Sequence, residues 1–155
     1  MVAILGLEHF VKLFFLIFIP AFICVSQSVC ADEKPTSVEV FYEAKKGKPI
    51  ERSMSGVGIK YYEVDKAESL EAELSKALPN DLNQASAYMS KYMNSASGQK
   101  KMKAIAEGYQ SIGRAFKLGV EKLPAVVIDE RYVVYGTTDI QRAISEWKSH
   151  VLRAS

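Results

Sequence analysis

The segment Leu123–Gly136 constrains the fold most, because it encodes two short apolar strands joined by a tight turn. Its sequence is LPAVVIDERYVVYG. Residues 125–128 and 132–135 are the apolar runs, and the charged residues 129–131 separate them. Two such runs with a short polar connection are typical of an antiparallel hairpin. A hairpin alone is marginally stable in water, so the rest of the chain must supply further strands and covering helices.

Periodicity predicts what precedes and follows this hairpin. Alternating apolar residues predict strands at 38–42 and 59–64, and the Lys-, Gly- and Pro-rich residues 43–56 between them predict a loop with room for one helical turn. Apolar residues then recur at helical spacing three times before the hairpin and once after it. This order predicts an α/β fold, in which a mixed sheet is flanked by helices.

Local signals predict where these helices begin. Asp65 with Glu68, and Thr138 with Gln141, have the spacing of capping boxes, and Asn80 can cap the second helix. The third helix is expected to begin near Ser97. The faces expected to be buried are Leu70, Leu74, Ala77 and Leu78; Leu82, Ala85, Met89, Tyr92 and Met93; Met102, Ile105, Tyr109, Ile112 and Phe116; and Ile140, Ile144, Trp147 and Val151.

Two glycines interrupt the third helix. Gly108 and Gly113 each cost about 1 kcal/mol relative to alanine inside a helix. Two explanations stay open for each position: another backbone approaches the helix closely there, or the glycine is simply tolerated at the surface.

Residues 13–25 form an uncharged apolar run. A membrane-spanning helix needs about 20 residues, so this shorter run fits the hydrophobic region of a secretory signal. Val29 and Ala31 stand at the two positions that signal peptidase reads. We therefore expect residues 1–31 to be a cleaved signal peptide and residues 32–155 to form one periplasmic domain.

Two alternatives to cleavage after Ala31 stay open. The leader can remain as an uncleaved N-terminal anchor, which would be the chain's only contact with a membrane. A lipoprotein cut before Cys30 is the second alternative, although Val29 is a poor residue immediately before a lipidated cysteine.

Both cysteines, Cys24 and Cys30, lie in the leader. A domain over residues 32–155 would therefore hold no disulfide, redox CxxC pair, thiolate nucleophile or zinc–thiolate site. His150 would be its one histidine, and no GxGxxG, GxxxxGK[ST], HExxH or GxSxG motif occurs. We therefore expect no catalytic residue, cofactor or metal. Met89, Met93 and Met102 have a spacing that favours core packing over a soft-metal site.

Lys45, Lys46 and Lys48 form a basic cluster in the first loop. It is a possible contact loop for DNA, lipid headgroups or an acidic partner, whereas exposed lysines around a glycine more commonly form a solvated surface. The formal net charge of +2 is small, and no nucleic acid partner is expected.

The order of elements, with Pro124 directly before the third strand, resembles the thioredoxin fold with an extra helical segment ahead of that proline. The resemblance implies a cis peptide bond before Pro124 and a nearby backbone that pairs with extended peptides. Leu123, Pro124 and Ala125 thus become a candidate peptide-binding edge. The other interpretation is that Pro124 only directs the chain into the strand.

Residues 118–136, with LEAEL at 70–74 and Leu78-Pro79, more particularly resemble a family of small exported proteins encoded in integrating conjugative elements. The resemblance covers most of residues 38–147. That family is assigned to conjugative DNA transfer without an established activity. The chain is similar, more distantly, to thioredoxin-like pilin-assembly proteins of F-type conjugation systems.

These resemblances imply a non-catalytic periplasmic accessory protein of a type IV secretion-like apparatus, which binds an envelope or pilus-assembly protein. The alternative is a relative of periplasmic thiol–disulfide oxidoreductases or disulfide chaperones. Active thioredoxins carry CxxC just after the first strand, where residues 43–56 of this chain contain no cysteine. Disulfide exchange is disfavoured, because a serine hydroxyl has no redox couple.

Overall fold

The computed structural model describes residues 34–154, so the predictions for the leader lie outside the described residues. The elements are β1 (Ser37–Tyr42), the 3-10 turn η1 (Ala44–Lys46), β2 (Gly58–Glu63), α2 (Lys66–Ala77), α3 (Leu82–Met93), α4 (Ala96–Lys117), β3 (Ala125–Ile128), β4 (Tyr132–Tyr135) and α5 (Ile140–Ala154). This order confirms the predicted α/β class. Within this described range, no helix is both long enough and apolar enough to cross a membrane.

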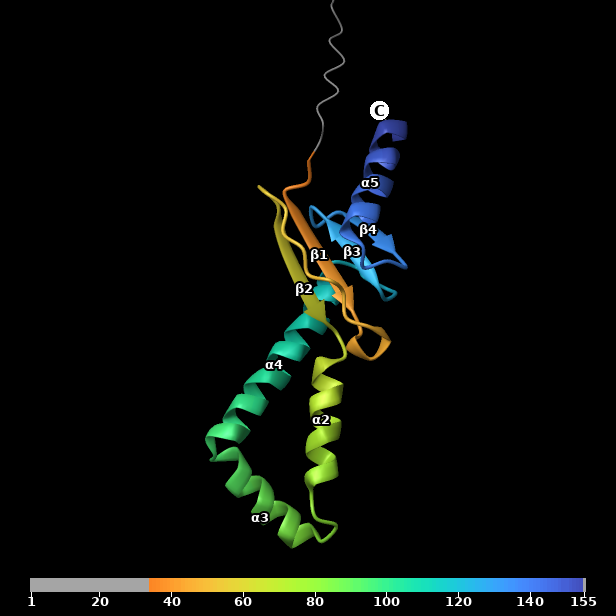
Figure 1. The fold of residues 1–155 in the computed structure, drawn as a ribbon. Coiled ribbons are helices and arrows are strands. Elements are labelled where there is room, and N and C mark those ends of the chain that lie inside the picture. Colours follow the sequence, from red (N-terminus) through yellow and green to blue (C-terminus); the bar gives the residue numbers. More distant parts are fainter. Residues whose placement is uncertain (1–33, 155) are drawn as a thin grey trace, which may run out of the picture. The chain divides into compact units, whose positions relative to one another are not determined.

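The four strands form one mixed sheet in the order β2-β1-β3-β4 (Figure 1). β1 is parallel to β2, whereas β3 is antiparallel to both of its neighbours, β1 and β4. The predicted mixed sheet flanked by helices is thus confirmed, and its strand order is compatible with a thioredoxin-like topology. Residues between β1 and β2 form the expected loop, with η1 as its single helical turn.

Each face of the sheet is covered by a different helix. On one face, the apolar side of α5 packs against alternate residues of β1 and β3, with Trp147 and Ile140 among the buried side chains. On the other face, Ala115 near the end of α4 packs against Phe41 and Val127. The predicted buried face of α5 is confirmed, because its apolar residues recur at helical spacing along the whole element.

A buried ion pair joins α4 to the sheet. Glu39 in β1 is only 4% exposed and lies on the face that α4 covers. Arg114 donates from Nε to Glu39 at 2.8 Å, and its Nη2 also bonds to Glu39 and to Glu130. Hydrogen bonds with these two carboxylates raise the pKa of Arg114 above its ordinary value, so the guanidinium stays charged.

The predicted buried face of α4 is wrong for three of its five residues. Tyr109, Ile112 and Phe116 are exposed, Phe116 by 86%. The buried residues of this helix are instead Gly98, Ile105, Gly108 and Ala115. Hydrophobic periodicity cannot reveal such a face, because three of these four residues are glycine or alanine.

The predicted faces of α2 and α3 are also only partly buried. Both helices lie beyond the end of the sheet and join α4 in a helical extension (Figure 1). In α3, Leu82 is 81% exposed, Met93 is exposed, and no residue is fully buried. In α2, Ala77 is exposed and only Ala67 is fully buried. The extension therefore has no core comparable with that of the sheet.

The two glycines of α4 have different surroundings. A Cβ atom at Gly108 would lie 2.6 Å from the backbone nitrogen of Ala67, so α2 and α4 pack with their backbones in close approach. At Gly113 a Cβ atom would meet nothing within 4 Å. Of the two explanations left open by the sequence, close approach thus holds for Gly108 and surface tolerance for Gly113.

The observed helix caps differ from the predicted ones. Asp81, rather than Asn80, caps α3, and its carboxylate accepts a first-turn N–H at 2.9 Å. Asp139, rather than Thr138, accepts the first free N–H groups of α5. Asp65 directly precedes α2 as predicted, but its side chain makes no cap, because it is bound elsewhere.

Asp129 fastens the start of β1 to the β3–β4 turn. Its carboxylate accepts from the backbone N–H and the hydroxyl of Thr36, at 2.8 and 2.7 Å, and from the Ser37 N–H at 2.9 Å. Burial alone would raise the pKa of Asp129, but these hydrogen bonds outweigh it and the pKa is lowered. The two turn residues Asp129 and Glu130 both have positive φ, 50° and 54°, as a tight hairpin turn requires.

Replacing Gly108 and Gly113 by alanine should change stability in opposite directions. Gly108→Ala places a methyl group against the Ala67 backbone and should lower the free energy of unfolding by about 1–3 kcal/mol. Gly113→Ala adds no contact and should raise it by about 0.5–1 kcal/mol, because alanine is the better helix former. Urea unfolding followed by circular dichroism measures both. Equal effects at the two positions would contradict the close approach of α2 and α4.

Candidate functional site

One end of the sheet brings together segments that are distant in sequence. β1 and β2 both end there, since Tyr42 is opposite Glu63. β3 begins and β4 ends at the same end, where Ala125 lies between Phe41 and Tyr135. The Pro124 turn, the loop after β1 and the turn before α5 therefore meet here (Figure 1). We call this the Pro124 end of the sheet.

The Leu123–Pro124 peptide bond is cis, as the thioredoxin resemblance implied. The Pro124 carbonyl accepts a hydrogen bond from Gly136 N–H at 2.8 Å. Within residues 34–154, no hydrogen bond reaches the backbone N–H or C=O groups of Lys122 and Leu123. Unpaired backbone groups at the end of a sheet can pair with an added extended segment.

Ala125 was predicted as part of this edge, and the structure corrects that assignment. Its side chain is fully buried, and its strand lies between β1 and β4, so its backbone faces a neighbour on both sides. Leu123 and Pro124 are half-buried and precede the first paired residue. The backbone N–H and C=O groups that can pair with an added segment are therefore those of Lys122 and Leu123.

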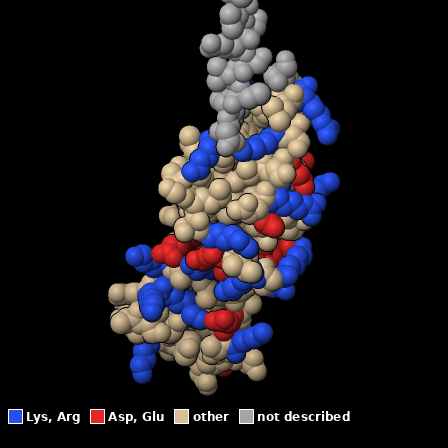
Figure 2. Space-filling view, turned by 45° about the horizontal axis from the view of Figure 1, so that its top comes forward, with Lys and Arg blue, Asp and Glu red and all other residues tan. Residues whose placement is uncertain are grey.

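The predicted basic loop lies at the Pro124 end, but its lysines are not free cations. Lys45 lies 3.3 Å from Glu43, Lys46 also pairs with Glu43, and Lys48 lies 3.7 Å from Glu63. The hydrogen bond to Lys46 lowers the pKa of Glu43. Acidic and basic side chains are likewise interspersed over the face shown in Figure 2. The loop therefore offers no patch of a single charge for nucleic acid.

Asp65 holds this loop in place. Its carboxylate accepts from the backbone N–H groups of Ala44 and Lys45, at 2.7 and 3.1 Å, and the residue is buried. Burial alone would raise its pKa, but these hydrogen bonds outweigh it and the pKa of Asp65 is lowered. The predicted capping box at Asp65 is therefore wrong, because its carboxylate binds the backbone of η1 and not that of α2.

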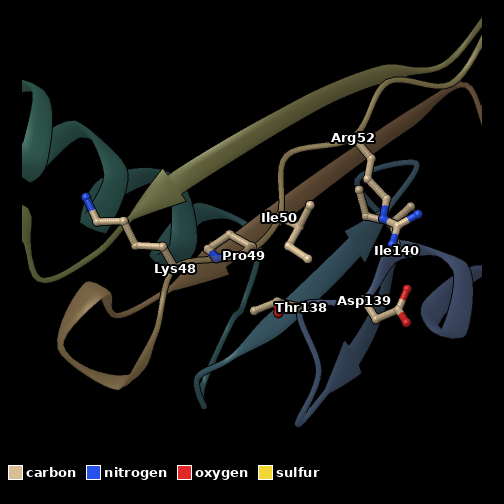
Figure 3. A pocket seen from close by; sticks show the side chains of 7 residues that line it. All are labelled: Lys48, Pro49, Ile50, Arg52, Thr138, Asp139 and Ile140. Carbon is tan, nitrogen blue, oxygen red and sulfur yellow. The ribbon is translucent and has the colours of Figure 1, made fainter.

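A recess of about 210 Å³ lies between the loop after β1 and the start of α5 (Figure 3). Its lining residues are Lys48, Pro49, Ile50, Arg52, Thr138, Asp139 and Ile140. Thr138 in its lining comes two residues after Gly136, which bonds to the Pro124 carbonyl, and Thr137 between them accepts from Asp139 N–H at 2.9 Å. Ile50 is largely exposed beside it, so the recess combines apolar surface with charges of both signs.

Sequence reasoning did not find this recess, because its two walls lie almost 90 residues apart in the chain. In the sequence, the residues that line it appear only as an apolar pair, Pro49 and Ile50, in a basic loop and as a polar turn before α5.

The three methionines considered as ligands of a soft metal do not form a buried group. Met93 is exposed, and Met89 and Met102 are half-buried. Among residues 34–154, no three His, Cys, Asp or Glu side chains are grouped to hold a metal ion.

Asp65→Asn should destabilise the protein at neutral pH, because the amide replaces a carboxylate that accepts two backbone N–H groups. We expect a loss of about 1–3 kcal/mol in the free energy of unfolding. The folded-state pKa of Asp65 is below its ordinary value of 3.8. Its contribution is therefore present above that value and disappears as the pH falls through the folded-state pKa.

Unfolding of both proteins between neutral and strongly acidic pH measures this difference. Asp81→Asn is the matched control, because asparagine caps a helix about as well as aspartate, and it should leave stability nearly unchanged. A difference between wild type and Asp65→Asn that persists undiminished in acid would contradict the role given to the carboxylate.

In a comparison with protein families, the model described as "Protein of unknown function (DUF1525)" matches residues 36–153. This range contains the whole sheet, all four α-helices except the last residue of α5, and the Pro124 end. No curated protein and no solved structure matches the chain.

Proposed function

The chain belongs to the DUF1525 family of proteins of unknown function, and we propose that it is a non-catalytic accessory protein of a conjugative, type IV secretion-like apparatus. It acts in the periplasm by binding an extended segment of an envelope or pilus-assembly protein at the Pro124 end of the sheet. The observation that carries this proposal is the pair of unpaired backbone units, Lys122 and Leu123, directly before the cis bond.

Binding at this point follows from main-chain chemistry. An extended segment beside Lys122 and Leu123 would exchange hydrogen bonds with their N–H and C=O groups, as in strand addition. Main-chain pairing supplies affinity independently of sequence, and side-chain pockets supply specificity. The recess next to the Pro124 turn supports this second part, since Pro49, Ile50 and Ile140 offer apolar contact while Arg52 and Asp139 offer charge.

The surroundings of the site favour binding over chemistry. The loop after β1 is held by Asp65 and by ion pairs from its lysines. Thiol–disulfide exchange would require Cys24 and Cys30, which stand six positions apart instead of in a CxxC pair. Residues 43–56, where active thioredoxins carry their CxxC, contain no cysteine.

The conjugative setting and export are supported by sequence alone. Residues 118–136, which resemble proteins of integrating conjugative elements, contain the cis bond and both strands of the hairpin. The leader's apolar run and the small residues after it support secretion. The binding site and the family resemblance therefore fall on the same segment.

Lys122→Pro should weaken partner binding, because proline removes the Lys122 N–H. Loss of one main-chain hydrogen bond, about 1 kcal/mol, corresponds to about a fivefold loss of affinity. Lys122→Ala is the matched control, since it removes the same exposed side chain but keeps the N–H. Partner recovery by crosslinking from donor cells, with thermal unfolding of both variants as a folding check, measures the effect. Equal recovery with the two variants would refute main-chain pairing at this position.

Deleting the coding region for residues 32–155 should abolish or strongly reduce transfer, because the partner would lose its accessory protein. Mating frequency and pilus assembly in the deletion strain, with complementation by the intact gene, provide the measurement. Normal transfer in that strain would rule out the conjugative role while leaving peptide binding at the Pro124 end open to its own test.

A further inference from the structure

The connection between α4 and β3 is held at its start by the end of the helix. Gly119 N–H donates to the Phe116 carbonyl at 3.1 Å, and Val120 N–H donates to the Ala115 carbonyl at 3.0 Å. These two bonds, with Gly119 at a φ of 69°, form the Schellman motif that commonly ends a helix. The Val120 side chain also packs against the apolar cluster that α4 covers. The chain therefore leaves α4 in a fixed direction.

Tyr135, the last residue of β4, holds the middle of the same connection. Val133, two residues earlier, packs on the face of the sheet that α4 covers, and alternation along the strand places Tyr135 on that face too. Its hydroxyl accepts from the Glu121 N–H at 3.3 Å and donates to the Gly119 carbonyl at 3.4 Å. One side chain thus bonds to the connection at two points.

Gly136, the next residue, holds the far end of the connection. Its N–H donates to the Pro124 carbonyl at 2.8 Å. Between the bonds at Glu121 and Pro124 lie only Lys122 and Leu123, whose backbone groups make no hydrogen bond within the described residues. We call these two residues the window. Consecutive residues at the end of β4 therefore fix the chain on both sides of the window.

Fixing the window before a partner arrives should favour binding. A loose loop loses backbone conformational entropy when a partner orders it, and this loss lowers the affinity. A loop that the protein's own hydrogen bonds already hold in place avoids that loss. Of the three fastenings, only that of the Tyr135 hydroxyl is made by a side chain. It can therefore be removed without changing the main chain.

We propose that Tyr135 is a positioning residue for binding at the Pro124 end. Its hydroxyl holds the window in one arrangement, and it limits main-chain pairing to Lys122 and Leu123, because the Glu121 N–H is already bound. The partner segment pairs over no more than two residues, and the rest of its contact comes from side chains. This inference rests on the proposed function, to which it adds the residue that prepares the site and the length of segment that the site takes.

Tyr135→Phe tests the positioning role, because it removes the hydroxyl and keeps the ring. Tyr132→Phe is the matched control, since it removes from the same strand a hydroxyl that has no hydrogen bond within residues 34–154. Nitrogen-15 relaxation of the purified protein should show backbone order parameters at residues 121–123 falling below about 0.6 in Tyr135→Phe only. A loss of global stability alone would not confine the change to these residues.

Binding is measured by partner recovery after crosslinking in donor cells. Recovery should fall about threefold to tenfold with Tyr135→Phe, because the partner must then order the window itself. Recovery with Tyr132→Phe should equal that of wild type. Thermal unfolding of both variants checks that they are folded.

Three results would overturn the proposal. They are unchanged order parameters at residues 121–123 in Tyr135→Phe, equal partner recovery with the two tyrosine variants, and increased recovery with Tyr135→Phe. An increase would mean that the hydroxyl competes with the partner for the Glu121 N–H.

Failure of this inference is distinguishable from failure of the proposed function. Equal recovery with Lys122→Pro and Lys122→Ala refutes main-chain pairing itself. A difference between those two variants, together with full recovery by Tyr135→Phe, refutes only the role of Tyr135.

Discussion

The ion pair between Glu39 and Arg114 determines how α4 lies on the sheet. A carboxylate buried on the face of a central strand is costly unless it is paired, and Arg114 is the residue that pairs it. Residues two positions apart in a helix point to nearly opposite sides. Turning Arg114 toward β1 therefore turns Ile112 and Phe116 toward solvent, and brings Gly108 to the side on which α2 crosses.

The parts of the fold that could be predicted from sequence are those with a local period. The hairpin 125–135, the strand 38–42 and the buried face of α5 each follow from the spacing of apolar side chains. The rotation of α4 could not be predicted this way, because it depends on one buried charge and on glycine contacts that carry no hydrophobicity. The role of Asp65 was missed for a related reason, because it binds backbone groups 20 and 21 residues upstream.

The candidate site was predicted in part. The sequence indicated Pro124 and the loop with Lys45 as two separate candidates, and in the structure both lie at the same end of the sheet. Their chemistry could not be predicted, because it depends on neighbours from other elements. Glu63, at the end of β2, pairs with Lys48, and the strand order places Ala125 in the middle of the sheet. The candidate site consists of the unpaired backbone groups of Lys122 and Leu123. A pattern of side-chain types cannot predict which backbone groups stay unpaired.

The hydrogen bonds from Asp129 to the start of β1 mark the end of the sheet that lies opposite the candidate site. The chain reaches β1 at the end of the sheet where Asp129 lies, and the unpaired groups of Leu123 lie at the other end. Six strand residues separate the two ends, a distance of about 20 Å. The first described residues, which lead into β1, thus lie at the end of the sheet opposite Leu123. A segment that pairs with Lys122 and Leu123 would therefore contact the domain at the end of the sheet opposite the Asp129 hydrogen bonds.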